Sequence, residues 1–336
     1  MTADPSLQAS AGARGTADPA SWNIETSLAK LPALTMSQAL EELAEERDDI
    51  VVLTADLASS NGLSSFAARY PERFVNTGIA EQNMMSVAAG LASTGLIAYV
   101  STFASFASLL CAEQLRTDLA YPRMKVRVLA HHAGISMGFY GTSHHAVEDI
   151  AITRAIGNLT VVSACDGAAV RGLIRATVDV DGPVYLRIGR GAERPVYDEV
   201  PEFQYGRFVP LAEGTDATVI ATGLGVKAAL DAADLLRGQV SLRVLDAAYL
   251  KPIDAEAILA AADETGAVLT VEEHNPHGGL GGAVAEVLAE SGRAVRFARH
   301  SLPDDYALVA PPTHLYRHYG LTGQGVADAV VALLAR

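Results

Sequence analysis

Apolar residues recur along the chain in two patterns, which predict alternating helices and strands. From Leu31 to Arg47 they fall on one helical face, with Met36 and Leu40 at helical spacing. The following run, Asp49 to Leu53, is short, continuous and β-branched, as buried parallel strands are. The alternation continues through residues 31–192, so this range predicts an α/β domain with a mostly parallel sheet.

A second α/β domain is predicted after a break in the pattern. Residues 193–214 are irregular and contain several prolines, which predicts a linker. Residues 215–336 alternate strands and helices again, so they predict another mostly parallel sheet. Residues 1–30 are rich in Ala, Ser, Gly, Asp and Pro, and we expect a disordered tail or one that a partner orders.

Composition excludes several classes of partner. The chain has 336 residues and a net charge of −14 without a dense Lys/Arg block, which argues against nucleic acid and anionic membranes. No apolar run reaches about 18 residues, and no signal peptide is recognisable, so we expect a cytoplasmic protein. Cys111 and Cys165 lack metal-ligand spacing and are expected to fill the core.

One carboxylate stands at the start of a predicted helix. A strand-like run from Arg73 to Val75 meets a turn at Gly78, and helical spacing begins near Ala80, which places Glu81 in the first turn. The positive end of the helix favours a carboxylate there, whereas burial disfavours its charged form. Such a carboxyl group can share a proton with a ring nitrogen. The alternative is an ordinary solvated glutamate.

Other candidates follow the predicted strands, because ligands of open α/β sheets bind at the carboxyl ends of strands. Ser60 lies in a small polar loop of this kind. Phe103 and Phe106 share a helical face, which fits either core packing or an aromatic wall for a flat ring. Arg190 can bind a phosphate or carboxylate, or can be a surface arginine, whereas Arg187 is expected to be on the surface or in a structural ion pair.

The loop from His131 to His145 concentrates four histidines and three glycines. Zinc is the first alternative, but the loop holds no matching Cys or carboxylate cluster. Histidines that carry protons and donate hydrogen bonds in an active-site loop fit better. A glycine-rich segment, Glu272 to Gly282, matches no nucleotide-binding pattern, so we expect it to serve tight packing at an interface.

Together these motifs resemble the C-terminal half of transketolase, from about Leu31 to the end. The resemblance implies a pyrimidine-binding domain and a transketolase C-terminal-like domain, as in the C-terminal subunit of a split transketolase. The implied activity is transfer of a two-carbon ketol unit from a small-molecule ketose donor to an aldehyde or related acceptor, with thiamine diphosphate as cofactor. The motifs are Ala55-Asp56-Leu57-Ala58, Gly78-Ile79-Ala80-Glu81-Gln82-Asn83-Met84-Met85, Ser101-Thr102-Phe103, the loop from Gly141 to His144, and Gly278-Gly279-Leu280-Gly281-Gly282.

The resemblance also implies roles for single residues. Glu81 matches the catalytic glutamate that contacts a ring nitrogen of the cofactor's aminopyrimidine, Phe106 matches the aromatic packed on that ring, and Phe103 lines the same pocket. His144 matches a histidine that contacts donor hydroxyls and helps to move protons. The implied substrate-binding residues are Ser60, His132, Tyr140, His144 and Arg190.

A partner subunit is implied as well. The family binds the diphosphate and its Mg²⁺ through a Gly-Asp-Gly motif followed by an asparagine, in its N-terminal domain. Cys165-Asp166-Gly167 does not fit that motif, and nothing else in this sequence does. We therefore expect no metal ligands in this chain, an N-terminal transketolase subunit that carries the diphosphate/Mg²⁺ site, and an α2β2 heterotetramer with active sites at interfaces.

Three departures from the family bear on the substrate. Phe139 and Tyr140 stand where the family usually shows Glu-Asp, and tyrosine cannot accept as an anion at neutral pH. Leu34 stands where a phosphate-binding arginine is usual. We expect reduced reliance on a phosphorylated pentose, or a less polar acceptor.

Other functions remain open at this point. The beta subunit of a 2-oxo acid dehydrogenase shares the two-domain layout and the glutamate, and a ketol transferase that loads a carrier in a biosynthetic pathway fits the altered pocket. A non-catalytic regulatory or scaffold subunit is a third alternative, against which Glu81, His132 and His144 all count.

Overall fold

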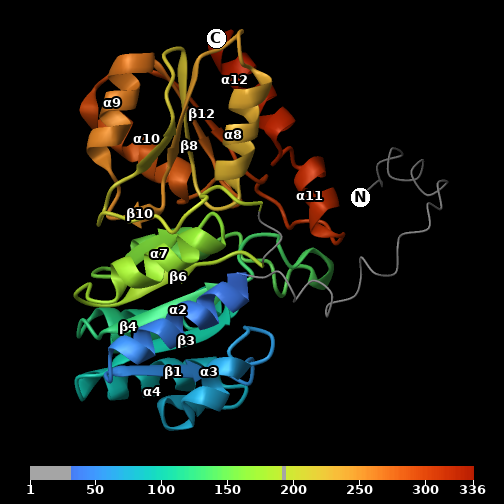
Figure 1. Cartoon of the computed structure of the whole chain (residues 1–336). Coiled ribbons are helices and arrows are strands. Elements are labelled where there is room, and N and C mark those ends of the chain that lie inside the picture. Colours follow the sequence, from blue (N-terminus) through green and yellow to red (C-terminus); the bar gives the residue numbers. More distant parts are fainter. Residues whose placement is uncertain (1–31, 191–193) are drawn as a thin grey trace, which may run out of the picture.

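The computed structural model describes residues 32–190 and 194–336, with side chains from residue 35 onward. The tail predicted for residues 1–30 and the side chain of Leu34 lie outside the described residues. Within those ranges the strands form one sheet of seven and one of five (Figure 1). No helix in the same ranges combines the length and apolarity needed to cross a membrane.

The first sheet has the strand order β10-β5-β6-β4-β3-β1-β2, and all its pairs are parallel except β10 with β5. Its central strands are buried along their whole length, as the mainly apolar sequence of β1 predicts. The bounds are β1 (Ile50–Thr54), β2 (Phe74–Asn76), β3 (Ile97–Phe103), β4 (Val126–His131), β5 (Thr160–Ser163) and β6 (Val184–Arg187).

Helices cover both faces of the first sheet. Helices α2 and α7 pack against each other, and α4 packs on β3 and on the π-helical segment η5 that follows β3. The helical segment that contains Phe106 is broken into π-helical and α-helical pieces. The bounds are α2 (Pro32–Glu46), α3 (Ser64–Arg69), η4 (Pro71–Arg73), α4 (Glu81–Ser93), η5 (Phe106–Leu110), α5 (Ala112–Gln114), η6 (Leu115–Ala120), η7 (Gly138–Tyr140), α6 (Asp149–Ala155) and α7 (Gly167–Thr177).

The second sheet has the order β12-β11-β8-β9-β7 and is parallel except for β7 with β9. Helices α8 and α12 pack together, and so do α9 and α10 (Figure 1). The strands are β7 (Val209–Ala212), β8 (Ala217–Ala221), β9 (Leu242–Asp246), β11 (Ala267–Val271) and β12 (Arg296–His300). The helices are α8 (Gly225–Leu235), α9 (Ala255–Thr265), α10 (Leu280–Ser291), α11 (Pro312–His318) and α12 (Gly323–Leu334).

These two mostly parallel sheets confirm the predicted α/β class. Two elements differ from expectation. Strand β7 lies within residues 193–214, the range predicted as a linker. Strand β10 (Tyr249–Lys251) comes from the second half of the chain but extends the first sheet, where Tyr249 lies opposite Val162 of β5. Short strands of this kind carry no periodicity, so the sequence did not reveal them.

The glycine-rich segment between β11 and α10 packs against the first domain, as predicted. A Cβ on Gly278 would lie 2.8 Å from the Cβ of Ala151 in α6. The start of α10 is already occupied by a side chain, because the carboxylate of Glu272 accepts from the N–H groups of Leu280 and Gly281 at 2.7 and 2.8 Å. The segment therefore serves the interface between the domains.

Candidate active site

The predicted site residues gather at one edge of the first sheet. In the parallel register, Phe103 at the end of β3 lies opposite His131 at the end of β4, and Ala130 lies opposite Arg187 of β6. The loops that follow these strands therefore leave the sheet at the same edge. This edge brings together segments that lie 84 residues apart in the sequence (187 − 103), as the pairing of Phe103 and Arg187 with β4 shows.

Phe103 is the centre of a cluster of rings. Its ring centroid lies 4.5 Å from that of His132 and 5.7 Å from those of both Phe106 and His144. Phe106 and His144 are themselves 5.4 Å apart in an edge-on arrangement. The two phenylalanines thus form a wall beside two imidazoles, and they do not simply fill the core, because Phe106 is only partly buried.

Glu81 is the first residue of α4 and is only 7 % exposed. The alternative of an ordinary solvated glutamate therefore does not hold. Helix α4 packs on η5, the segment that Phe106 begins. Burial and, after it, the charge of Glu81 raise the pKa of the Cys111 thiol at the end of η5 to about 12. The carboxylate thus lies within electrostatic range of the segment that carries the aromatic wall.

Two of the four histidines support the structure of the loop, and the other two have a ring nitrogen that can contact a ligand. His131 is buried against the thioether of Met36, and His145 holds the backbone carbonyl of Gly138 at 3.2 Å. His132 is 7 % exposed, and its Nδ1 is buried without a hydrogen-bond partner among the described residues. His144 pairs its Nδ1 with the Ser143 hydroxyl at 2.8 Å, which leaves Nε2 for a ligand.

Burial favours the neutral form of the His132 and His144 imidazoles. It lowers the pKa of His144, and it lowers the pKa of His132 well below the ordinary value, helped by the neighbouring His131 and Arg190. A neutral imidazole has one nitrogen that donates and one that accepts, so each can bind a hydroxyl in either direction.

Phe139 and Tyr140 place aromatic rings where a carboxylate pair is usual in the family that the sequence resembles. The Tyr140 ring lies 4.8 Å from the ring of His144, and the Phe139 ring lies 4.9 Å from that of Tyr140. The guanidinium of Arg190 lies over the Phe139 ring at 5.1 Å. Arg190 is half-buried, and burial lowers its pKa. It therefore belongs to the site and is not an isolated surface arginine.

Ser60 differs from the other predicted residues. It is exposed in the loop after β1, and no contact described in the structure joins it to the ring cluster. Its neighbour Asn61 is buried and donates to the Ser101 hydroxyl of β3 at 2.9 Å. The loop is thus anchored at the same edge of the sheet, with Ser60 at its outer side.

Two carboxylates that sequence reasoning did not select hold the histidine loop in place. The buried Arg187 and Asp149 form an ion pair at 2.9 Å, as the alternative of a structural pair predicted for Arg187. Arg187 also donates to the carbonyls of Ala146 and Glu273. The carboxylate of Glu273 accepts from the N–H of Ile135 at 2.7 Å. The second domain thus holds one end of the loop through Glu273, and Arg187 of the first domain holds the other end at Ala146.

The edge fits a flat ring that bears hydrogen-bonding groups, such as the aminopyrimidine of thiamine diphosphate. Besides His132 Nδ1, the buried hydroxyls of Thr102 and Ser105 lack partners among the described residues, and they flank the two phenylalanines. Buried polar atoms are normally paired, and a ring that bears donors and acceptors would pair with those of these atoms that face it. In the described ranges no three His, Cys, Asp or Glu side chains are placed to hold a metal ion.

Comparison with known proteins agrees with both domains. Residues 33–195 match the family model of the transketolase pyrimidine-binding domain, and residues 206–326 match that of the transketolase C-terminal domain. A putative transketolase C-terminal section of Methanocaldococcus jannaschii is 41 % identical over 297 residues, which cover 88 % of this chain and 93 % of that protein. The B-type subunit of the apulose-4-phosphate transketolase of Phocaeicola vulgatus is 38 % identical, covering 90 % and 97 % respectively.

A solved structure supports the same assignment. A split-gene transketolase, described as an inactive β4 tetramer, is 42 % identical and superposes with a TM-score of 0.82, covering 90 % of this chain and 98 % of that one.

Proposed function

Because the chain belongs to the transketolase family, we propose that it is the pyrimidine-binding subunit of a split, thiamine-diphosphate-dependent ketol transferase. It would move a two-carbon unit from a ketose donor to an aldehyde or related acceptor. The observation that carries the proposal is the buried Glu81 at the start of α4, next to the segment that bears the aromatic wall.

Each residue of the site has a role in this proposal. Glu81, in the first turn of α4, would share a proton with a ring nitrogen of the aminopyrimidine. Phe103 and Phe106 pack on the ring and exclude water. His144 moves protons to and from donor hydroxyls, and His132 binds the distal end of the substrate. The cofactor, when bound, supplies the electron sink for carbon–carbon bond cleavage.

A second polypeptide completes the site in this proposal. We assign the diphosphate and Mg²⁺ to an N-terminal transketolase subunit, with two copies of each chain in the assembly. Support comes from the relatives, one named a C-terminal section and the other named as one subunit of a transketolase, which this chain matches over nearly their whole length. The similar tetramer made of beta chains alone is described as inactive, which agrees with a need for the partner.

Phe139 and Tyr140 of the histidine loop bear on the substrate that we propose. Tyr140 stacks on His144, and Phe139 holds the guanidinium of Arg190, so the loop offers no anionic group to read a sugar hydroxyl. We propose a donor or acceptor that is less polar than a phosphorylated pentose. With the partner present, xylulose 5-phosphate and ribose 5-phosphate should turn over slowly, and Tyr140→Asp should raise that rate. Ordinary rates that Tyr140→Asp leaves unchanged would refute this assignment.

Glu81→Gln tests the proposed function itself. We expect ketol transfer by the assembled enzyme to fall by about 10²–10⁴-fold, the usual contribution of a positioned proton-sharing group, while assembly stays intact. Glu113→Gln is the matched control, because Glu113 is exposed, pairs with Arg116 and lies just beyond the aromatic wall. Equal activity of the two variants would overturn the proposal. Turnover of a 2-oxo acid with a lipoyl domain, in place of a ketose, would favour the dehydrogenase alternative.

A further inference from the structure

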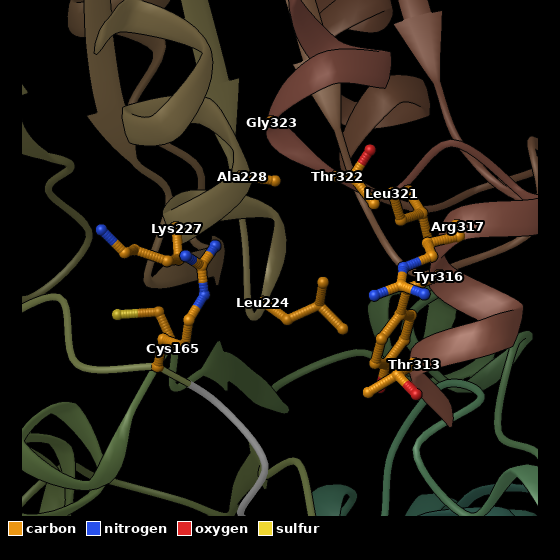
Figure 2. Close-up of a pocket in the computed structure, with 11 residues that line it drawn as sticks. Cys165, Leu224, Lys227, Ala228, Thr313, Tyr316, Arg317, Leu321, Thr322 and Gly323 are labelled. Atoms are coloured by element: carbon orange, nitrogen blue, oxygen red, sulfur yellow. The ribbon is translucent and has the colours of Figure 1, made fainter. Parts of the chain in front are cut away.

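A second cavity, separate from the ring cluster, lies where the C-terminal domain meets the first. It has a volume of about 450 Å³ and lies between α8, α11 and the start of α12, with Cys165 of the first domain at one side (Figure 2). None of the residues proposed above for cofactor or substrate lines it. Its volume is within the range of about 300–1,000 Å³ typical of small-molecule sites.

Basic residues line this cavity on two sides. Lys227 of α8 and Arg317 of α11 lie on opposite walls in Figure 2, where the Lys227 side chain runs away from Leu224, and Arg194 is a third lining cation. No Asp or Glu is among the described residues that line it. Asp231 lies outside the lining, where it pairs with Lys227 at 3.1 Å and with Arg194. One carboxylate thus offsets part of the charge of three cations, in a chain whose net charge is −14.

The rest of the lining is mainly apolar, with hydroxyls at the rim. Leu224 projects into the middle of the cavity, and Tyr316 and Leu321 cover the wall that carries Arg317 (Figure 2). Thr322 adds a hydroxyl at the start of α12. A compact body on the apolar wall, with an anionic group between the facing cations, would satisfy all of these features at once.

We propose that this cavity binds a small phosphate-bearing molecule, which acts as an effector of the loop from residue 138 to residue 145. Arg and Lys together favour a phosphoryl group, because guanidinium binds it bidentately and ammonium binds it as a point charge. The inference concerns Lys227, Arg194 and Arg317 and does not depend on the reaction proposed above.

Helix α11 connects the cavity to that loop. Tyr316 and Arg317 face the cavity from one part of the helix, and α11 packs on η7, the turn that carries Phe139 and Tyr140. The contact is tight, since a Cβ on Gly138 would lie 2.3 Å from the carbonyl oxygen of Ala310 and 2.9 Å from Pro312. A ligand that fixes Arg317 therefore biases the position of α11 and of the loop packed against it.

Calorimetric titration of the full chain with inorganic phosphate, and separately with pyrophosphate, tests the binding. We expect wild type and Arg190→Gln to bind alike, and Arg317→Gln and Lys227→Gln to bind at least about tenfold more weakly, the loss of one charge-assisted hydrogen bond. Arg293→Gln, which changes an exposed arginine paired with Asp263, is the matched control. Undiminished binding by both Arg317→Gln and Lys227→Gln would overturn the proposal, as would loss of binding in Arg190→Gln.

Hydrogen exchange of the same proteins tests the connection to the loop. Pyrophosphate should slow amide exchange in residues 138–145 of wild type and leave that exchange unchanged in Arg317→Gln. If pyrophosphate leaves amide exchange in this loop of the wild type unchanged, the effector role is wrong. Because neither measurement uses turnover, the result is independent of whether Glu81→Gln inactivates the assembled enzyme.

Discussion

Asp149→Asn should destabilise the chain far more than the loss of a typical ion pair. The pair between Asp149 and Arg187 spans 2.9 Å, and the two side chains are 0 % and 3 % exposed. Asparagine keeps the shape but removes the paired carboxylate, which leaves the buried guanidinium only the charge of Glu273 to offset its own. Removing one partner of such a pair costs about 3–5 kcal/mol, a large part of the roughly 5–15 kcal/mol that typically separates folded from unfolded domains.

Urea unfolding of the full chain, followed by circular dichroism, measures this cost. The matched control is Glu286→Gln, because Arg154 and Glu286 also form a pair, at 2.7 Å, but the glutamate is 62 % exposed. Loss of this pair should lower the free energy of unfolding by less than about 1 kcal/mol, because water screens exposed pairs. Arg154 keeps its bonds to the carbonyls of Gly278 and Gly279 in that variant.

A double variant separates charge burial from simple loss of contacts. Asp149→Leu with Arg187→Met removes both charges, so it should be more stable than Asp149→Asn, although the carbonyls of Ala146 and Glu273 lose a donor. If Asp149→Asn costs no more than Glu286→Gln, the reasoning from desolvation is wrong. The same conclusion would follow if the double variant were the least stable of the three.

Three further predictions concern other buried groups. Gly134→Ala should cost more than about 2 kcal/mol in the same assay, because the backbone has φ +62° and the new Cβ would lie 2.1 Å from Cδ of Glu273. Burial lowers the pKa of His131 from 6.5 to about 4, so the folded state binds fewer protons than the unfolded state. The stability due to this group is therefore complete above pH 6.5 and is lost as the pH falls towards 4. The loss due to this group should be about 2 kcal/mol between pH 7 and pH 5, and His131→Leu should remove that part of the pH dependence. The Cys111 thiol, with a pKa of about 12, should resist Ellman's reagent at pH 8 until the chain unfolds, and prompt labelling of the folded chain would contradict its burial.

The sequence predicted the sheet edge and most of the residues that lie together there, because both depend on local patterns. Apolar runs located the strands, and parallel pairing then required that the loops with Phe103, His132 and Arg190 leave at one edge. The burial of Glu81 could only be left open, since a helix start is compatible with a solvated or a buried carboxylate.

Other features depend on contacts between distant segments. Glu273 lies on the other domain, and no spacing in the sequence links it to the histidine loop that it holds; Asp149 follows the loop closely but acts through Arg187, which comes from a later strand. The position of Arg190 over the Phe139 ring depends on η7, a single turn without a periodic signature. The proposed effector cavity is equally hidden, because Arg194, Lys227 and Arg317 come from three separate parts of the chain.

Strand β10 belongs to the second half of the chain but extends the sheet of the first half, which limits where the chain can be divided. A fragment that ends near residue 192 would retain β5 but lose the neighbour that covers its free edge. Unpaired strand edges recruit other chains, so such a fragment should self-associate and not remain a monomer. The two halves are therefore not independent modules, and a graft of the first half must carry Tyr249 to Lys251 with it.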